Sequence, residues 1–231
     1  MLQLLFCLLV LSTSVTAQSV IISAPNTDIT PKGEVMLAHE SQWNRFQTGN
    51  YWNSFTFGTY GLSKNTELAA TLYGLDRPAT GNVALGVGLK HRWLHRTTAS
   101  GWQWEGSAGF MSPLSVSGRG LGGWGFGNVS VRAPGVRTRV TVGPSYGSSQ
   151  IFGRGTYSTL VGLEQPVSKQ FSLVADWFSG THDLAAAIGG FAWHPRRELV
   201  VILAYKVPNN AASGKPAPLV ELTYNFTARR R

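Results

Sequence analysis

One short stretch of the sequence combines the residue types that hydrolytic enzymes use. Ser179 lies three residues before His182, and Asp183 follows directly. Nucleophilic hydrolysis needs a hydroxyl, an imidazole and a carboxylate within hydrogen-bond reach of one another. Neighbouring residues of a strand point to opposite faces, and no nucleophile motif accompanies these three residues. Hydrolysis of an acyl ester or a peptide is therefore the less favoured alternative, and we predict that the protein is not an enzyme.

Patterns typical of metal and cofactor sites are also weak. The five histidines are scattered along the chain, and Cys7 is the single cysteine. Residues 120–125 read GLGGWG and match GxGxxG formally, but no helical pattern follows, as a dinucleotide site requires. We predict neither a metal nor a cofactor.

Charged residues follow a different pattern, in which they share one face of an extended segment with small residues. In residues 81–93, GNVALGVGLKHRW, the residues Val87, Leu89 and Trp93 fall on one face, and Gly88, Lys90 and Arg92 fall on the other. Side chains alternate in this way along a β-strand. The alternation predicts a strand with two unlike faces, and the composition must decide which face meets water.

The composition favours a surface that meets lipid. Only 13% of the residues are charged, about half the roughly 25% of a typical soluble domain, whereas 43% are hydrophobic. The 8 tryptophans suit membrane interfaces, and the length allows one domain. The net charge of +9 comes from basic residues dispersed along the chain or placed at turns, so we predict no nucleic-acid partner.

The chain after residue 17 shows strand periodicity and no long helical pattern. Short turns alternate with longer loops rich in Gly, Ser, Asn and Pro, an asymmetry typical of outer-membrane barrels. Twelve strands are expected over residues 33–43, 51–62, 66–75, 81–93, 101–111, 122–132, 137–146, 155–165, 170–179, 183–193, 198–207 and 218–226.

Energetic cost decides which strand face is outside. An Arg near the bilayer midplane costs about 2 to 4 kcal/mol, and each clean strand places its charges on the small-residue face. The apolar faces are therefore expected to contact lipid, with Trp and Tyr at the membrane interfaces. Closing the sheet leaves no unpaired edge in hydrocarbon. We predict an all-β fold: a transmembrane antiparallel up-and-down β-barrel of about 12 strands in a bacterial outer membrane.

The ends of the chain indicate export. Residues 4–11 form an apolar run followed by small residues, which predicts a signal peptide at residues 1–17. This run is far shorter than the roughly 20 residues of a membrane-spanning helix. We expect a periplasmic N-terminal segment at residues 18–32, the barrel at residues 33–226 and a basic tail at residues 227–231.

Several segments resemble known outer-membrane proteins. The last strand ends in alternating aromatics at Phe226 and resembles the closing strand of bacterial outer-membrane barrels, which implies recognition by the barrel-assembly machinery. TPKGEVML (residues 30–37), GLEQPVSKQFSLVADWFSG (162–180) and AYKVPNN (204–210) resemble the outer-membrane transporter barrels named after the meta-pathway of phenol degradation. This resemblance implies a barrel fold and a role in transport.

The function then depends on what the lumen contains. The charged side chains predicted to face inward include both acidic and basic residues. They either steer a small polar or anionic solute along the wall or brace the barrel through ion pairs. Four basic residues fall toward the periplasmic half, which predicts a mild anion preference: Lys90, Arg92, Arg137 and Arg139. The predicted lumen-lining residues are Lys90, Arg92, Glu105, Arg139, Asp176, Lys206 and Glu221, joined by Glu67 and Glu164.

We therefore predict a channel or transporter for passive passage of small solutes, with outer-membrane lipid, the assembly machinery and small solutes as partners. A non-conducting structural or assembly-partner barrel is the main alternative, and a secreted β-sandwich is the third. The sequence does not indicate the oligomeric state or the solute.

Overall fold

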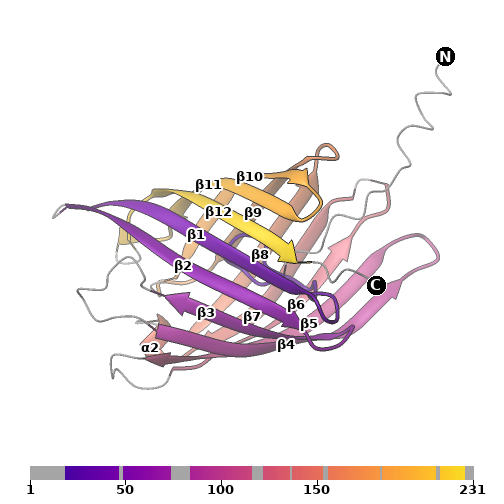
Figure 1. Cartoon of the computed structure of the whole chain (residues 1–231), viewed down its shortest axis with the longest axis horizontal. Helices are drawn as coiled ribbons and strands as arrows, with labels where there is room; N and C mark the ends of the chain where they lie inside the picture. The colour runs from indigo at the N-terminus through magenta and orange to yellow at the C-terminus, as the bar shows by residue number, and fades with distance from the viewer. Residues whose placement is uncertain are drawn as a thin grey trace, which may run out of the picture.

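The computed structural model describes residues 19–46, 49–73, 84–115, 122–135, 137–152, 156–182, 184–211 and 214–226. Within these ranges, twelve antiparallel strands form one closed barrel, with a single short helical turn (Figure 1). The elements are β1 (Val35–Phe46), β2 (Gly49–Gly61), β3 (Thr66–Tyr73), β4 (Ala84–Thr97), β5 (Gln103–Ser115), β6 (Trp124–Arg132), β7 (Arg139–Gly147), α2 (Ser149–Phe152), β8 (Tyr157–Pro166), β9 (Phe171–Phe178), β10 (Ala186–Arg196), β11 (Leu199–Pro208) and β12 (Ala217–Phe226). The predicted fold class is confirmed.

Each strand pairs with the next one in the sequence, and β12 pairs with β1 to close the ring. The β1–β12 register runs from Val35 opposite Phe226 to Gln42 opposite Leu219. Because the sheet closes on itself, every strand has a neighbour on both sides, as a β-structure in a bilayer requires. Among the described residues, no helix has the length and apolar character needed to cross a membrane.

The start of β1, the end of β12 and the short turns lie at one end of the barrel (Figure 1). In outer-membrane barrels with an even number of strands, both termini and the short turns lie on the periplasmic side. We therefore name this end the periplasmic end and the opposite one the outer end.

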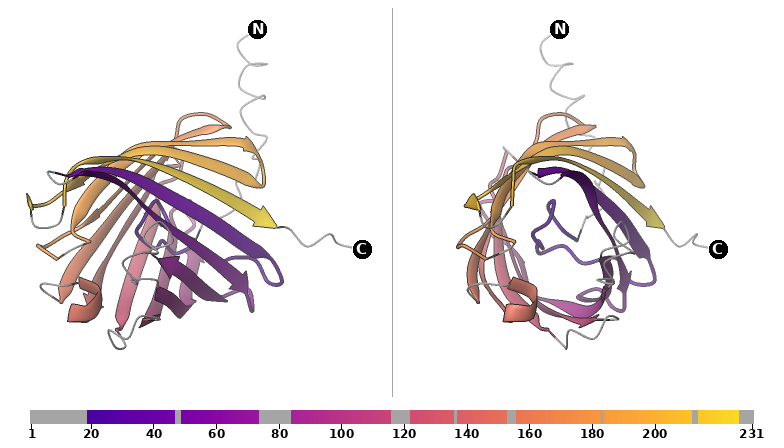
Figure 2. Two further views of the ribbon diagram at one scale, coloured as in Figure 1. Left: turned by 60° about the vertical axis from the view of Figure 1, so that its left-hand side comes forward. Right: turned by 90° about the vertical axis from the view of Figure 1, so that its left-hand side faces the viewer.

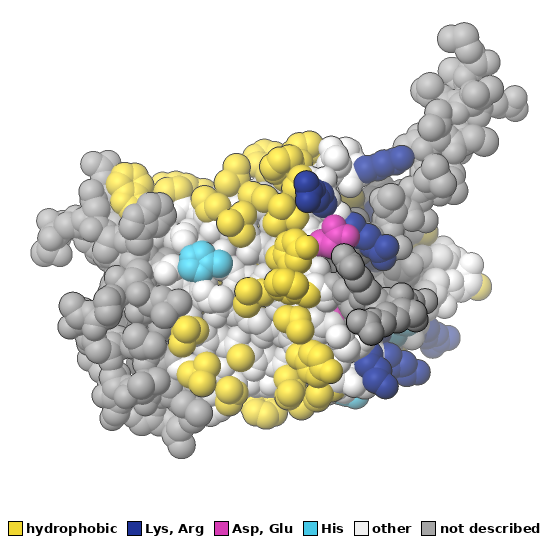
Figure 3. Space-filling view, viewed as in Figure 1, with side chains coloured by type: hydrophobic (Ala, Val, Ile, Leu, Met, Phe, Trp, Pro, Cys, Tyr) yellow, Lys and Arg dark blue, Asp and Glu magenta, His cyan; other side chains and the backbone are white. Residues whose placement is uncertain are grey.

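The strand alternation predicted for residues 81–93 is present in β4. Leu85 and Val87 are exposed, whereas Gly86, Gly88 and Lys90 are buried. Hydrophobic side chains form a band across the wall of the barrel, and basic side chains gather at the periplasmic end (Figure 3). A wall that is apolar outside and closed by backbone pairing suits the hydrocarbon core of a membrane.

Exposed aromatic side chains gather toward both ends of the strands. Phe171 stacks on Trp193 near the periplasmic end, and Tyr146 meets Tyr157 edge-on near the outer end. Aromatic girdles of this kind mark the two interfaces of a membrane barrel. The residues predicted for girdles are all exposed: Trp93, Trp102, Trp104, Trp193 and Tyr224.

The interior departs from the predicted rule that apolar side chains face lipid. A cluster of buried aliphatic residues lies on the inner face of β9 to β12, with Val174, Ile188, Val200, Ile202 and Leu219. Alternation places these residues inside, and they are apolar because a further segment of the chain packs on them.

Candidate functional site

The segment before β1 lies inside the barrel. Residues 19–30, here named the plug, run within the ring of strands (Figure 2, right). Ile22, Asn26 and Thr27 belong to no strand, yet they have no exposed surface. The sequence assigned residues 18–32 to the periplasm, and the structure corrects this for the described residues 19–30. The lumen is therefore occupied by the protein's own chain.

The plug is a compact turn joined to the wall by a tether. Ile21 N donates to Ala24 O at 2.8 Å, and Asn26 N donates to Ser19 O at 3.3 Å. At the tether, residues 31–34, Gly33 adopts a φ of +79°, a left-handed conformation that glycine adopts without strain. Gly33 N donates to Gly61 O at 2.8 Å, which fixes the tether to the end of β2.

Asp176 on β9 binds the plug backbone. Its Oδ2 accepts hydrogen bonds from Ile22 N at 3.1 Å, Ser23 N at 2.8 Å and Ala24 N at 2.8 Å. Three successive backbone amides that converge on one oxygen form an anion-binding nest. Asp176 is buried, and a buried carboxylate is costly unless charge-assisted hydrogen bonds of this kind stabilise it.

An ion pair on the opposite wall holds both ends of the plug. Lys90 Nζ lies 2.9 Å from Glu67 Oε1, and the two residues are direct cross-strand partners on β3 and β4. Lys90 Nζ donates to Ser19 O at 2.8 Å, and Ser19 Oγ donates to Glu67. Thr30 N donates to Glu67 Oε2 at 2.6 Å. The pair therefore binds the first and the last residue of the plug.

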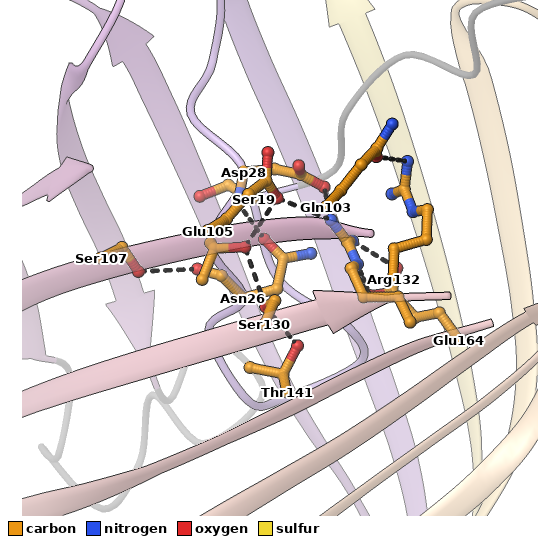
Figure 4. Close-up of polar contacts among 12 residues, drawn as sticks. Ser19, Asn26, Asp28, Gln103, Glu105, Ser107, Ser130, Arg132, Thr141 and Glu164 are labelled. Atoms are coloured by element: carbon orange, nitrogen blue, oxygen red, sulfur yellow. Dashed lines mark hydrogen bonds and ion pairs between the residues drawn. The ribbon is translucent and has the colours of Figure 1, made fainter. Parts of the chain in front are cut away.

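A second group of charged side chains binds residues 27 and 28 of the plug (Figure 4). The Arg139 guanidinium donates to both carboxylate oxygens of Glu164, and its Nη1 donates to Asp28 Oδ2 at 2.6 Å. Thr27 Oγ1 donates to Glu105 Oε2 at 3.0 Å, and Glu105 Oε2 lies 3.9 Å from Arg139 Nη1. One wall cation thus joins β5, β8 and the plug.

Neutral side chains of the wall complete the polar contacts. Thr27 Oγ1 lies 2.8 Å from Ser130 Oγ, and Ser130 Oγ in turn lies 2.7 Å from Thr141 Oγ1. Asn128 Nδ2 donates to Pro25 O at 2.6 Å, and Ser107 Oγ donates to Asn26 O at 3.3 Å. Figure 4 shows Ser107 reaching Asn26 and Ser130 reaching Thr141 from neighbouring strands.

The opposite side of the plug is apolar. Ile21 and Ile22 pack into the aliphatic cluster of β9 to β12 described above. The plug is therefore amphipathic, with isoleucines against one wall and hydroxyl, amide and carboxylate groups against the other. This division explains why the inner face of the barrel is polar on one side and apolar on the other.

The residues predicted to line the lumen fall into two groups. Lys90, Glu67, Glu105, Arg139 and Asp176 contact the plug directly, and Glu164 binds Arg139 on the wall. The others contact the wall: Arg92 Nη2 donates to Lys64 O at 3.0 Å, Lys206 Nζ to Gln42 Oε1 at 3.4 Å, and Glu221 accepts from Thr223 Oγ1 at 2.9 Å.

Sequence reasoning missed Glu40, Asp28 and the plug hydroxyls. Ser23 Oγ donates to Glu40 Oε2 at 3.1 Å, and Glu40 is buried on the inner face of β1. Its inward neighbours Met36 and Ala38 are apolar, so the two faces of β1 look alike in the sequence. The lone carboxylate in that strand was the available signal.

A cavity of about 400 Å³ lies beside the plug. It is lined mainly by apolar side chains. The polar residues of the lining are Gln42, Ser54, Thr59, Thr71, Lys206 and the Glu67–Lys90 pair on the wall, and Ser19 and Ser23 on the plug. Trp124 lies 5.3 Å from Phe126 and 6.2 Å from Phe178, measured between ring centroids. Ligand sites of proteins typically have this size and combine an apolar lining with few polar groups. The inward aromatic residues of the lining are Phe55, Phe57, Trp124, Phe126 and Phe178.

The candidate hydrolytic residues have structural contacts. Ser179 Oγ accepts a hydrogen bond from Thr159 N at 2.7 Å. The His182 ring stacks on Phe152, with ring centroids 4.2 Å apart, and is buried. Asp183 lies outside the described residues. These contacts give Ser179 and His182 roles in joining the outer end of β9 to its surroundings.

Comparisons with known proteins identify the fold. The chain matches no protein-family model and no curated relative. Among solved structures, it is similar to the KdgM porin, solved in complex with disordered oligogalacturonate, with a TM-score of 0.52 and 9% identity over 85% of this chain and 99% of the porin. It is also similar to outer-membrane phospholipase A from Escherichia coli, with a TM-score of 0.51 and 11% identity over 93% of this chain and 97% of the phospholipase.

These similarities show a shared fold, that of bacterial outer-membrane barrels. Together with the apolar exterior, the fold makes the outer membrane the location of the protein. At such low identity, the similarities transfer neither the porin's ligand nor the phospholipase's activity.

Proposed function

We propose that the protein is an outer-membrane channel for the passive passage of small solutes. The observation that carries this proposal is the cavity of about 400 Å³ that remains inside the closed barrel beside the plug. A barrel that serves only as an anchor gains stability from a filled interior, because empty space forfeits packing. A lumen that keeps room for a ligand is better suited to solute passage.

The lining supports a particular kind of solute. Aromatic and aliphatic side chains favour an apolar body, and Gln42, Thr71 and Lys206 offer a few hydrogen-bonding groups. The resemblance of residues 162–180 to the meta-pathway transporter barrels supports transport as well, and membership of that family is part of this proposal. The porin neighbour was solved with oligogalacturonate, so an acidic sugar is the competing solute class to test.

Uptake into proteoliposomes tests the proposal. Radiolabelled benzoate, galacturonate and glucose are supplied to vesicles that hold the refolded protein, and planar bilayers report its conductance. We expect conductance and faster entry of benzoate than of either sugar. Thr71 points into the cavity and Ala70 points to lipid, so T71W should slow uptake and A70W serves as the matched control. No uptake and no conductance by the folded protein would contradict the proposal.

The density of plug contacts favours the second candidate, a non-conducting structural barrel. Asp176, Arg139 and the Glu67–Lys90 pair all bind the plug, as an interior brace would. In that case, neither the wild-type protein nor a variant lacking residues 19–30 conducts, although both fold.

A further inference from the structure

We infer that the plug is a displaceable gate: Asp176 latches it through the Ile22–Ala24 amides, and it swings out toward the periplasmic end on the tether at Gly33. This inference rests on the proposed channel function and adds the element that controls it. It assigns residues 19–30 a closed position inside the lumen and an open position outside it.

The backbone pairing of the plug permits departure. In the described chain, the isolated bridges of this region are Val20 with Pro25, within the plug, and Lys32 with Gly61, at the tether. The twelve-strand ladder is continuous without the plug, because each strand pairs with its neighbours. The plug can therefore leave while the hydrogen bonds of the barrel wall stay intact.

Two cross-strand ion pairs of the wall remain when the plug leaves. Lys90 keeps Glu67 at 2.9 Å, and Arg139 keeps both oxygens of Glu164. A buried charge left without a partner is costly, so these cross-strand pairs reduce the cost of an empty lumen. In each of the two pairs, the acid and the base are direct cross-strand partners, and their contacts with the plug are additional.

Asp176 is the group that changes its partners most. Its Oδ2 holds three plug amides, and these donors leave with the plug. In the open state, water takes their place. Lys206 remains as the nearby cation, because Asp176 and Lys206 are both register partners of Ile188 on the strand between them. The latch therefore binds the closed state specifically, as a gate requires.

The direction of opening follows from the tether. Residues 31–34 leave the plug at the periplasmic end and continue into β1, and Gly33 N and Gly61 N form backbone hydrogen bonds there. Because the tether fixes the plug at the periplasmic end, the shortest way out of the barrel for the plug is through that end. The path then opened is lined by Ser107, Asn128, Ser130 and Thr141, which bind the plug or its neighbours in the closed state.

A reversible lock tests the gate. Thr27 on the plug and Ser130 on the wall bring their oxygens within 2.8 Å, which suits the short Cβ separation of a disulfide. T27C/S130C in a C7S background introduces two cysteines into a chain with no other. We expect oxidised T27C/S130C to lose at least nine-tenths of the wild-type conductance in a planar bilayer and to regain it on addition of dithiothreitol.

A second disulfide pair is the matched control. Ser145 and Ser158 are cross-strand partners that are both buried on the inner face of β7 and β8, so S145C/S158C links wall to wall without a covalent bond to the plug. We expect its conductance to be unchanged by oxidation. Equal conductance of oxidised and reduced T27C/S130C would overturn the gate and leave the channel function standing.

Deletion of residues 19–30 separates the two proposals. A folded deletion variant that conducts several-fold more than the wild-type protein supports the gate. A folded deletion variant that conducts no more than lipid alone would overturn the channel function and the gate with it. Folding of each variant is checked by its heat-dependent mobility on a gel.

Discussion

Ile21 of the plug lies directly over Gly162 of the barrel wall: a Cβ added to Gly162 would fall 1.9 Å from Ile21 Cδ1. Gly162 is buried on the inner face of β8, and Ile21 is nearly fully buried. The close approach is possible because glycine has no side chain. Ile21 therefore occupies the space that a side chain at residue 162 would fill.

The first prediction concerns this contact. Gly162→Val should force Ile21 out of its seat and raise single-channel open probability several-fold. Ile21→Ala in the same chain should restore the wild-type value, because the smaller side chain makes room. Gly127→Val is the control, since an added Cβ there meets nothing within 4 Å. If G162V and G127V conduct alike, the plug is not held by this contact.

The second prediction concerns Asp176. Asp176→Asn removes the charge that receives three plug amides, and a hydrogen bond to a charged acceptor contributes about 1.5 to 3 kcal/mol against about 0.5 to 1.5 for a neutral one. We expect more frequent opening events in planar-bilayer recordings. Adding the T27C/S130C disulfide to D176N should abolish those openings. Openings that persist in the oxidised triple variant would mean that D176N acts elsewhere than on the plug.

The strand content was predictable because alternation is a local signal. Every strand of the structure overlaps a range predicted from parity, and β4 places Leu85 and Gly86 on the expected faces. The plug was not predictable in this way. Its residues owe their positions to partners far away in the sequence, such as Asp28 with Arg139 and Ser19 with Lys90. The three hydrogen bonds to Asp176 come from backbone amides of the plug, so the pattern of side chains in the sequence does not indicate them.

The third prediction concerns which strand face meets lipid. Spin labels at Leu85 and Val142 should be relaxed strongly by lipid-soluble oxygen, because both side chains are exposed on the apolar exterior. Labels at Gly86 and Thr141 should be shielded from it, since both positions are buried on the inner face. The reverse order in power-saturation measurements would contradict the membrane orientation proposed for the wall.

The fourth prediction concerns the cost of a charge in the exterior band. Val142→Arg should lower the free energy of unfolding by about 2 to 4 kcal/mol if residue 142 lies near the midplane, the range for basic residues there. Urea-induced unfolding in phospholipid vesicles measures this, with Val142→Leu as the control of similar size. A V142R variant as stable as V142L would place residue 142 outside the hydrocarbon.

The fifth prediction concerns ion selectivity. The sequence predicted a mild anion preference from Lys90, Arg92, Arg137 and Arg139, but Lys90 and Arg139 are each held by carboxylates. Arg139→Met leaves Glu164, Asp28 and Glu105 without their shared cation. Reversal potentials under a salt gradient should therefore shift toward cation selectivity in R139M and less so in R92M, where the side chain is partly exposed. Identical reversal potentials in R139M and wild-type protein would show that Arg139 does not face the conducting path.

The pairing of β1 with β12 makes the perimeter of the ring depend on residues near the end of the chain. A product that stops before Ala217 exposes the free edges of β1 and β11, whose amides and carbonyls find no partner in hydrocarbon. Partial insertion of a truncated chain is therefore not a stable outcome. The closed wall of this protein therefore requires the ten residues of β12.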